Sequence, residues 1–141
     1  MKILFPTDGS PHSLATLTAF IERRAWFRES AELTLFYAHL PLPYKRAVAW
    51  AGKDAVHSYY EEESEAALAE ARKLLDDRGV AYAVEKRVGD PAEEIVACAE
   101  AEGFALVVMG THGHTALVNL VMGSVATKVL AARKVPVLFM V

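Results

Sequence analysis

The chain has 141 residues, of which 53% are hydrophobic and 23% charged, so it can bury a core and is not a disordered or low-complexity protein. Fifteen lysines and arginines against 18 aspartates and glutamates give a formal net charge of −3, which argues against a nucleic-acid surface and a polybasic lipid-binding segment. The single cysteine, Cys98, excludes an intrachain disulfide framework and suits a reducing compartment.

The apolar runs are short. The longest, at residues 104–110 and 135–141, are about seven residues long, whereas a membrane-spanning helix needs about 20. The apolar stretch at the N-terminus is too short for a signal peptide and ends in turn residues. We therefore expect a soluble cytoplasmic protein that binds neither nucleic acid nor membrane, with residues 1–141 forming a single domain.

Apolar runs alternate with helical patterns from the start of the chain. In the first half we expect a strand at 2–7, a helix from residue 10 or 11 to about 26, a strand at 32–40, a loop at 41–53 and a long helix at 54–78. Leu14, Leu17 and Ile21 recur at helical spacing in the first helix, and Gly79 ends the second. The loop is predicted from two prolines, a glycine and mixed aromatic and basic residues.

The second half continues the same alternation. We expect a strand at 80–88, a helix at 90–103, a strand at 104–109, a helix from 123 to about 133 and a strand at 135–141. The helix at 90–103 has a clear start signal, with Asp90 as N-cap, Pro91 at the first helical position and Glu93 at the third.

Five strands separated by helices predict an α/β fold with one doubly wound open sheet of five parallel strands and helices on both faces. Right-handed crossovers favour the strand order 3-2-1-4-5, in which the winding direction reverses between strands 1 and 4. Ligands of such sheets bind beyond the carboxyl ends of the strands at that switch point. We therefore expect the site at residues 8–10 and from Gly110 onward.

The segment from Gly110 to Ser124 joins a strand to a helix at this point. Gly110 and Gly113 let the backbone turn tightly and approach a ligand, and Gly123 and Ser124 precede the free N–H groups of a helix N-terminus. This chemistry suits phosphate, and the alternative is a plain connection in which Ser124 caps the helix. A P-loop motif and a G-x-G-x-x-G motif after the first strand are both missing from the sequence, which argues against a P-loop NTPase and a dinucleotide dehydrogenase.

The spacing Gly110-x2-Gly113-x9-Gly123-Ser124 resembles the ATP-binding pattern G-x2-G-x9-G-[ST] of the universal stress protein family. Residues 5–10, 39–40, 89–95, 107–113 and 135–138 are also similar to segments of that family, so the resemblance covers nearly the whole chain. It implies an adenine nucleotide across the switch point, ATP or else ADP or AMP, with Mg²⁺ carried on the phosphates.

The same resemblance implies which residues bind the nucleotide. Leu40 would pack on adenine, Asp8 would lie near the ribose or the base, and the phosphates would be held largely by backbone N–H groups. The predicted binding residues are Pro6, Thr7, Asp8, Leu40, Met109, Gly110, His112, Gly113, His114, Gly123, Ser124 and Val125. His114 stands where many family members carry Arg or Lys, which makes one charge near the phosphates dependent on pH.

The last predicted strand indicates that the chain pairs with a second copy of itself. Residues 136–141 would form an apolar sheet edge, and pairing with a second copy of the chain would cover it. The family resemblance implies the same homodimer.

We interpret the chain as a dimeric, nucleotide-responsive stress or signalling factor whose downstream protein partner the sequence does not identify. The sequence shows no general base aimed at a γ-phosphate, so at most slow hydrolysis is expected. Two alternatives stay open: a slow ATP-hydrolysing enzyme, and a nucleotide-free dimeric interaction module.

Two groups of side chains could suggest catalysis or metal binding, but the sequence favours neither. Asp8, Ser10 and His12 could suggest a catalytic triad, but Ser10 is a natural helix cap. His12, His112 and His114 could suggest a metal site, but no thiolate or carboxylate cluster completes a ligand set.

Two further features have a favoured and a less favoured interpretation. Cys98 has apolar neighbours in its helix, which favours a buried core residue over a redox sensor. The aromatic and basic residues of 41–53 either cover the core or form a nucleotide lid or partner surface.

Overall fold

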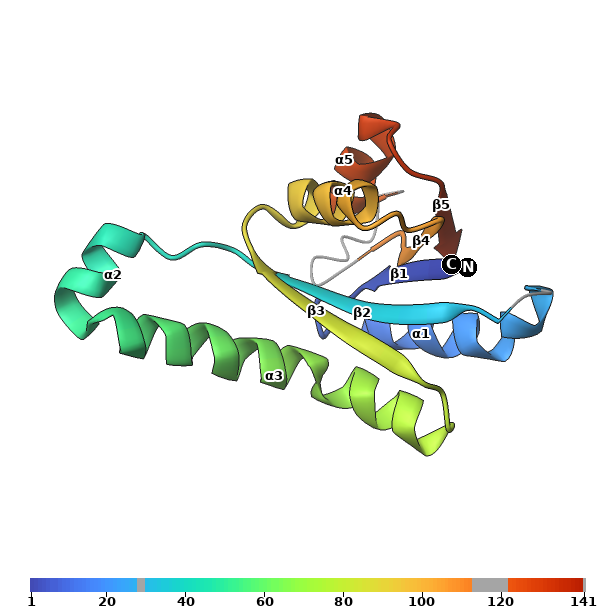
Figure 1. Ribbon diagram of the computed structural model, residues 1–141, viewed down its shortest axis with the longest axis horizontal. Helices are drawn as coiled ribbons and strands as arrows, with labels where there is room; N and C mark the ends of the chain where they lie inside the picture. The colour runs from blue at the N-terminus through green and yellow to red at the C-terminus, as the bar shows by residue number, and fades with distance from the viewer. Residues whose placement is uncertain (28–29, 113–121, 141) are drawn as a thin grey trace.

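The computed structural model describes residues 1–27, 30–112 and 122–140. Its strands are β1 (Lys2–Pro6), β2 (Glu32–His39), β3 (Tyr82–Val88), β4 (Leu106–Gly110) and β5 (Val137–Met140). Its helices are α1 (Pro11–Glu22), α2 (Tyr44–Ala51), α3 (Lys53–Asp77), α4 (Pro91–Ala101) and α5 (Ser124–Ala132), with a short 3₁₀ turn, η1, at Arg24–Trp26. The strands form one parallel sheet in the order β3-β2-β1-β4-β5 (Figure 1), which confirms the predicted fold class.

Helices cover both faces of the sheet, with α1 and α3 on one side and α4 and α5 on the other (Figure 1). Side chains alternate along a strand, so Ile3 and Phe5 pack with α1 and α3 while Leu4 packs with α4 and α5. All three are fully buried, as expected for a central parallel strand covered on both faces.

The two central strands pair over a short length. β1 pairs with β4 at Ile3↔Leu106 and Leu4↔Val107, whereas its pairing with β2 continues to Pro6↔Phe36. The carboxyl ends of β1 and β4 therefore separate at the point where the winding reverses.

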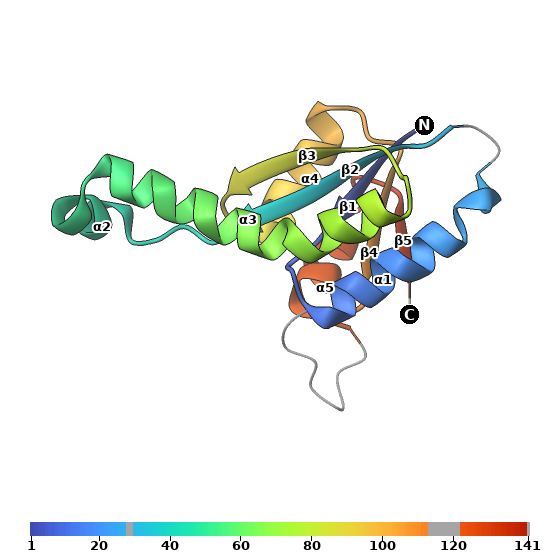
Figure 2. The same ribbon diagram turned by 90° about the horizontal axis from the view of Figure 1, so that it is seen from below.

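The predicted loop at 41–53 is wrong, because α2 occupies most of it. Both prolines of this segment come before the helix, with Pro43 as its N-cap, so they do not interrupt its hydrogen bonds. Gly52, with φ of 84°, then separates α2 from α3. Figures 1 and 2 show α2 and the start of α3 extending beyond the sheet.

The longest helix, α3, has 25 residues and is amphipathic rather than apolar, with Leu68, Ala71 and Leu75 on its buried face as predicted. Within the described ranges, no helix is both long enough and apolar enough to cross a membrane.

Two helix starts follow the sequence signals. The Ser10 side chain accepts a hydrogen bond from the Ser13 amide at 3.1 Å and caps α1. Asp90 caps α4, because its Oδ1 accepts from the amides of Ala92 and Glu93 at 3.1 and 3.2 Å. Its Oδ2 also accepts from Lys128 Nζ at 3.0 Å, which connects α4 to α5.

Replacing Asp90 tests the cap of α4. Asp90→Ala should lower the free energy of unfolding by about 1–2 kcal/mol, as for other lost N-caps, whereas Asp90→Asn should keep most of that stability because asparagine also caps helices. The ion pair itself adds little, since both side chains are partly exposed. Urea denaturation at pH 7 measures both variants, and equal losses would contradict a capping role.

The Asp90 carboxylate should also make the free energy of unfolding depend on pH. The hydrogen bond from Lys128, and then the bond from the Glu93 amide, hold the pKa of Asp90 below its usual value. A lowered pKa in the folded state stabilises the protein above the unfolded pKa, near ~4, and this contribution is lost as the pH falls through the folded pKa. The stability advantage of the native chain over Asp90→Asn should therefore shrink between pH 5 and pH 2.

Candidate functional site

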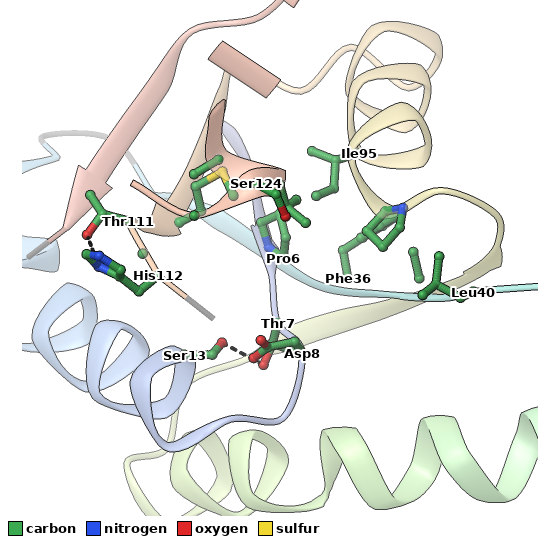
Figure 3. A pocket seen from close by; sticks show the side chains of 17 residues that line it. Pro6, Thr7, Asp8, Ser13, Phe36, Leu40, Ile95, Thr111, His112 and Ser124 are labelled. Atoms are coloured by element: carbon green, nitrogen blue, oxygen red, sulfur yellow. Dashed lines mark hydrogen bonds between the residues drawn. The ribbon is translucent and has the colours of Figure 1, made fainter. Parts of the chain in front are cut away.

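A cavity of about 350 Å³ lies at the switch point, beyond the carboxyl ends of β1 and β4 (Figure 3). Its volume falls within the range of roughly 300–1,000 Å³ that is usual for small-molecule sites. All the predicted site residues that the structure describes line it: Pro6, Thr7, Asp8, Leu40, Met109, Gly110, His112, Gly123, Ser124 and Val125. Gly113 and His114 lie outside the described residues.

One end of the cavity is apolar. Phe36, Leu40 and Ile95 lie on the same side of it (Figure 3), with Ala38 and Pro91 also in the lining. Leu40 is 61% exposed, so its side chain is available at the mouth of the cavity rather than covered by protein. Such a surface can pack against a flat ring.

The polar wall at the end of β1 is held by its own hydrogen bonds. The Thr7 Oγ1 accepts from Ser13 Oγ at 2.8 Å and from the Gly9 amide at 3.2 Å, and Thr7 is 8% exposed. The Asp8 Oδ1 accepts from the Ser10 amide at 2.9 Å. These contacts fix the turn from β1 into α1 and hold the Asp8 carboxylate at the cavity wall.

The N-terminus of α5 faces the same cavity. Ser124, Val125 and Ala126 form its first turn and line the cavity. The N-cap is Gly123, and unlike α1 and α4 this helix has no side-chain cap among the described residues. No acidic residue lies in its first turn. Backbone N–H groups at such a helix end and the helix dipole together favour an anion.

The structure corrects the expected role of Gly123. Its amide already donates to the Thr111 carbonyl at 2.6 Å, so this N–H is used within the protein. Ser124 is the first helical residue and not the cap, which also rules out the alternative of a serine-capped connection.

The structure also shows why Gly110 is a glycine. Gly110 and Gly123 do not have positive φ, and Gly123 has φ of −69°, which other residues adopt. A Cβ on Gly110 would lie 2.7 Å from Thr16 Oγ1, so a larger residue there would require the Thr16 side chain of α1 to shift. Gly9 does need glycine for its φ of 76°, and a Cβ there would lie 2.8 Å from the Ala67 carbonyl oxygen.

Sequence reasoning missed several lining residues, although their spacing carried a signal. The positions 36, 38 and 40 alternate along β2 and its end, and 91 and 95 lie one turn apart on α4, so each set shares a face. The missed residues are Ser13, Phe36, Ala38, Pro91, Ile95, Thr111 and Ala126.

The structure gives two of the three triad residues, Asp8 and Ser10, structural roles. Ser10 is 1% exposed and caps α1, and Asp8 accepts from its amide, so these residues form a turn and a cap. In the part of the chain that the structure describes, no group of three or more His, Cys, Asp or Glu residues could hold a metal ion. His112 Nδ1 instead hydrogen-bonds with Thr111 Oγ1 at 2.9 Å.

Cys98 belongs to the core and not to the cavity. It is fully buried against the sheet on α4. Burial, followed by the charge of Glu102, raises the pKa of Cys98 to about 11. The reactive thiolate is therefore scarce at neutral pH, which favours the core interpretation over a redox sensor.

Comparison with known proteins gives a consistent match. The model of the universal stress protein family matches residues 1–140. Universal stress protein MJ0531 of Methanocaldococcus jannaschii is 35% identical over 137 residues, which covers 97% of this chain and 79% of the relative.

Solved structures share the fold. The structure of MJ0577, a universal stress protein of the same archaeon, has a TM-score of 0.77 at 29% identity, covering 99% of this chain and 94% of the other. A universal stress protein in complex with cAMP has a TM-score of 0.59 at 22% identity, covering 100% and 97%. A family protein from Arabidopsis thaliana with AMP bound has a TM-score of 0.66 at 14% identity, covering 99% and 90%.

Proposed function

The chain belongs to the universal stress protein family, and we propose that it binds an adenine nucleotide, ATP or else ADP or AMP, in the cavity at the switch point. The observation that carries this proposal is the first turn of α5, which lines a cavity with an apolar end and whose N-cap, Gly123, has no side chain to bond its backbone N–H groups.

The phosphates are assigned to α5. The amides of Ser124, Val125 and Ala126 are the first of that helix, and the Ser124 hydroxyl adds a further donor. Gly123 supports this arrangement indirectly, because the bond from its amide to Thr111 fixes the helix start. Gly113 and His114 are proposed as further phosphate contacts on the strength of the sequence motif alone.

Adenine is assigned to the apolar end. Leu40 would pack on the ring, with Phe36 and Ile95 behind it, and Asp8 would face the ribose. The two relatives crystallised with cAMP and AMP bind ligands that share adenine, ribose and phosphate, although at 22% and 14% identity their likeness to this chain is one of fold.

Mg²⁺ would reach the site on the nucleotide. Mg²⁺ usually keeps several of its waters and binds through the phosphates of its substrate, so the nucleotide itself would carry it. We propose that the protein responds to the bound nucleotide as a stress or signalling factor rather than turning it over rapidly.

Residues 1–141 are proposed to act as a single cytoplasmic domain that forms a homodimer through residues 136–141. In support, β5 is an edge strand of the sheet, and an unpaired edge can pair with a second copy.

The molar mass measured by light scattering tests this dimer. It should be about twice the 15.4 kDa of one chain, and the mass of a single chain at micromolar concentration would contradict the dimer.

A proline at position 124 tests the backbone N–H directly. Proline is well tolerated at the first position of a helix, and Gly123 has φ of −69° and ψ of 161°, which suit a residue before proline. Ser124→Pro should therefore keep α5 while removing both the hydroxyl and the N–H. We expect ATP to bind Ser124→Pro about 10–100-fold more weakly than it binds Ser124→Ala, because the two variants differ by this N–H and hydrogen bonds to charged groups contribute about 1.5–3 kcal/mol.

Ser124→Ala is the matched control, since it removes the hydroxyl and keeps the N–H. Calorimetric titration with ATP and Mg²⁺ should rank the native chain above Ser124→Ala and Ser124→Ala above Ser124→Pro, with similar thermal unfolding for all three. Equal affinities of the two variants would contradict phosphate binding by this amide. Absence of ATP binding by the native chain would contradict the proposed function itself.

A further inference from the structure

Tyr60 of α3 reaches the segment that follows β2. Its hydroxyl oxygen accepts a hydrogen bond from the Leu42 amide at 2.9 Å. Its ring packs against the ring of His39, with centroids 4.9 Å apart and planes at 70°. His39 Nδ1 in turn donates to the Leu40 carbonyl at 2.6 Å. Two side chains therefore hold the backbone on both sides of Pro41.

This stretch of backbone has little other support. The ladder between β2 and β3 ends at His39, whose carbonyl accepts from the Gly89 amide at 2.9 Å, and α2 begins at Tyr44. Residues 40–43 between them belong to no helix or strand. The Pro43 carbonyl accepts from the amides of Arg46 and Ala47 at the start of α2. The position of residues 40–42 depends on side-chain contacts, and the bond to Tyr60 is one of them.

Leu40 is the residue whose position matters for the cavity. It lines the apolar end, yet it is 61% exposed, so burial does not hold its side chain in place. Its placement must come from its backbone, which the contacts of His39 and Tyr60 fix. Tyr60 itself is not part of the cavity lining.

We propose that Tyr60 is a positioning residue that sets how Leu40 meets the base of the ligand, an inference that rests on the proposed function. Tyr60 does not touch the nucleotide. It holds the Leu42 amide, and through the short backbone from Leu42 to Leu40 it fixes the apolar platform for the adenine ring. The hydrogen bond joins residues 18 positions apart in the sequence, and the spacing of the glycine motif does not predict it.

Tyr59 provides a matched control. Its ring also contacts His39, with centroids 5.5 Å apart and planes at 74°, but the Leu42 amide donates to Tyr60. Tyr60→Phe and Tyr59→Phe each remove one hydroxyl from neighbouring positions and keep both rings. Only the first of them removes the proposed support of Leu40.

We expect Tyr60→Phe to weaken ATP binding about 3–10-fold, the size of effect of one lost neutral hydrogen bond, and Tyr59→Phe to change it by less than 2-fold. Binding of inorganic triphosphate, measured by competition, should be unchanged in both variants, because triphosphate has no base to meet Leu40. Thermal unfolding of each variant checks that the fold is kept.

Leu40→Ala separates positioning from a general structural effect. If Tyr60 acts through Leu40, adding Tyr60→Phe to Leu40→Ala should produce no further loss of ATP affinity, whereas independent effects would add. An additive double variant, an equal loss for triphosphate, or unchanged ATP binding by Tyr60→Phe would each overturn the inference while leaving the proposed function intact. A native chain that binds no ATP would overturn the proposed function first, and the inference with it.

Discussion

The backbone N–H groups at the start of α5 are the feature on which the account of this site depends. The parallel order of the sheet brings this helix end to the same edge as the carboxyl ends of β1 and β4, and those two strands pair only over Ile3 and Leu4. The reversal of winding therefore places the first N–H groups of a helix with a glycine N-cap beside an open cavity. Neither feature alone would make a site, because the donors need room in front of them and the cavity needs a polar end.

The helix ends of this fold are stabilised in different ways. Ser10 and Asp90 use their side chains to cap α1 and α4, which occupies amides that could otherwise meet a ligand. The start of α5 is fixed from outside its first turn, by the bond from the Gly123 amide to Thr111 and by the contact of Lys128 with Asp90. This arrangement stabilises α5 although its N-cap, Gly123, has no side chain to bond the N–H groups of its first turn.

Much of the fold was predictable, because hydrophobic periodicity, caps and crossover handedness are local signals or follow from chain topology. The sequence pattern does not reveal helix α2, because Pro41 and Pro43 are typical of a loop, although both precede the helix. Two other features depend on tertiary contacts that the sequence pattern does not reveal. They are the hydrogen bond from the Gly123 amide to Thr111 and the packing of Thr16 against Gly110. The same holds for Tyr60, whose bond to Leu42 requires α3 to fold back against the end of β2.

The most direct measurement is a titration of ¹⁵N-labelled protein with ATP, followed by the amide resonances in NMR spectra. We expect large shifts for the amides of Ser124, Val125 and Ala126, with a smaller shift for Gly123, which is already bonded to Thr111. Saturable binding that leaves the resonances of α5 unmoved, or an unchanged spectrum at millimolar ATP, would contradict the claim that these amides hold the phosphates.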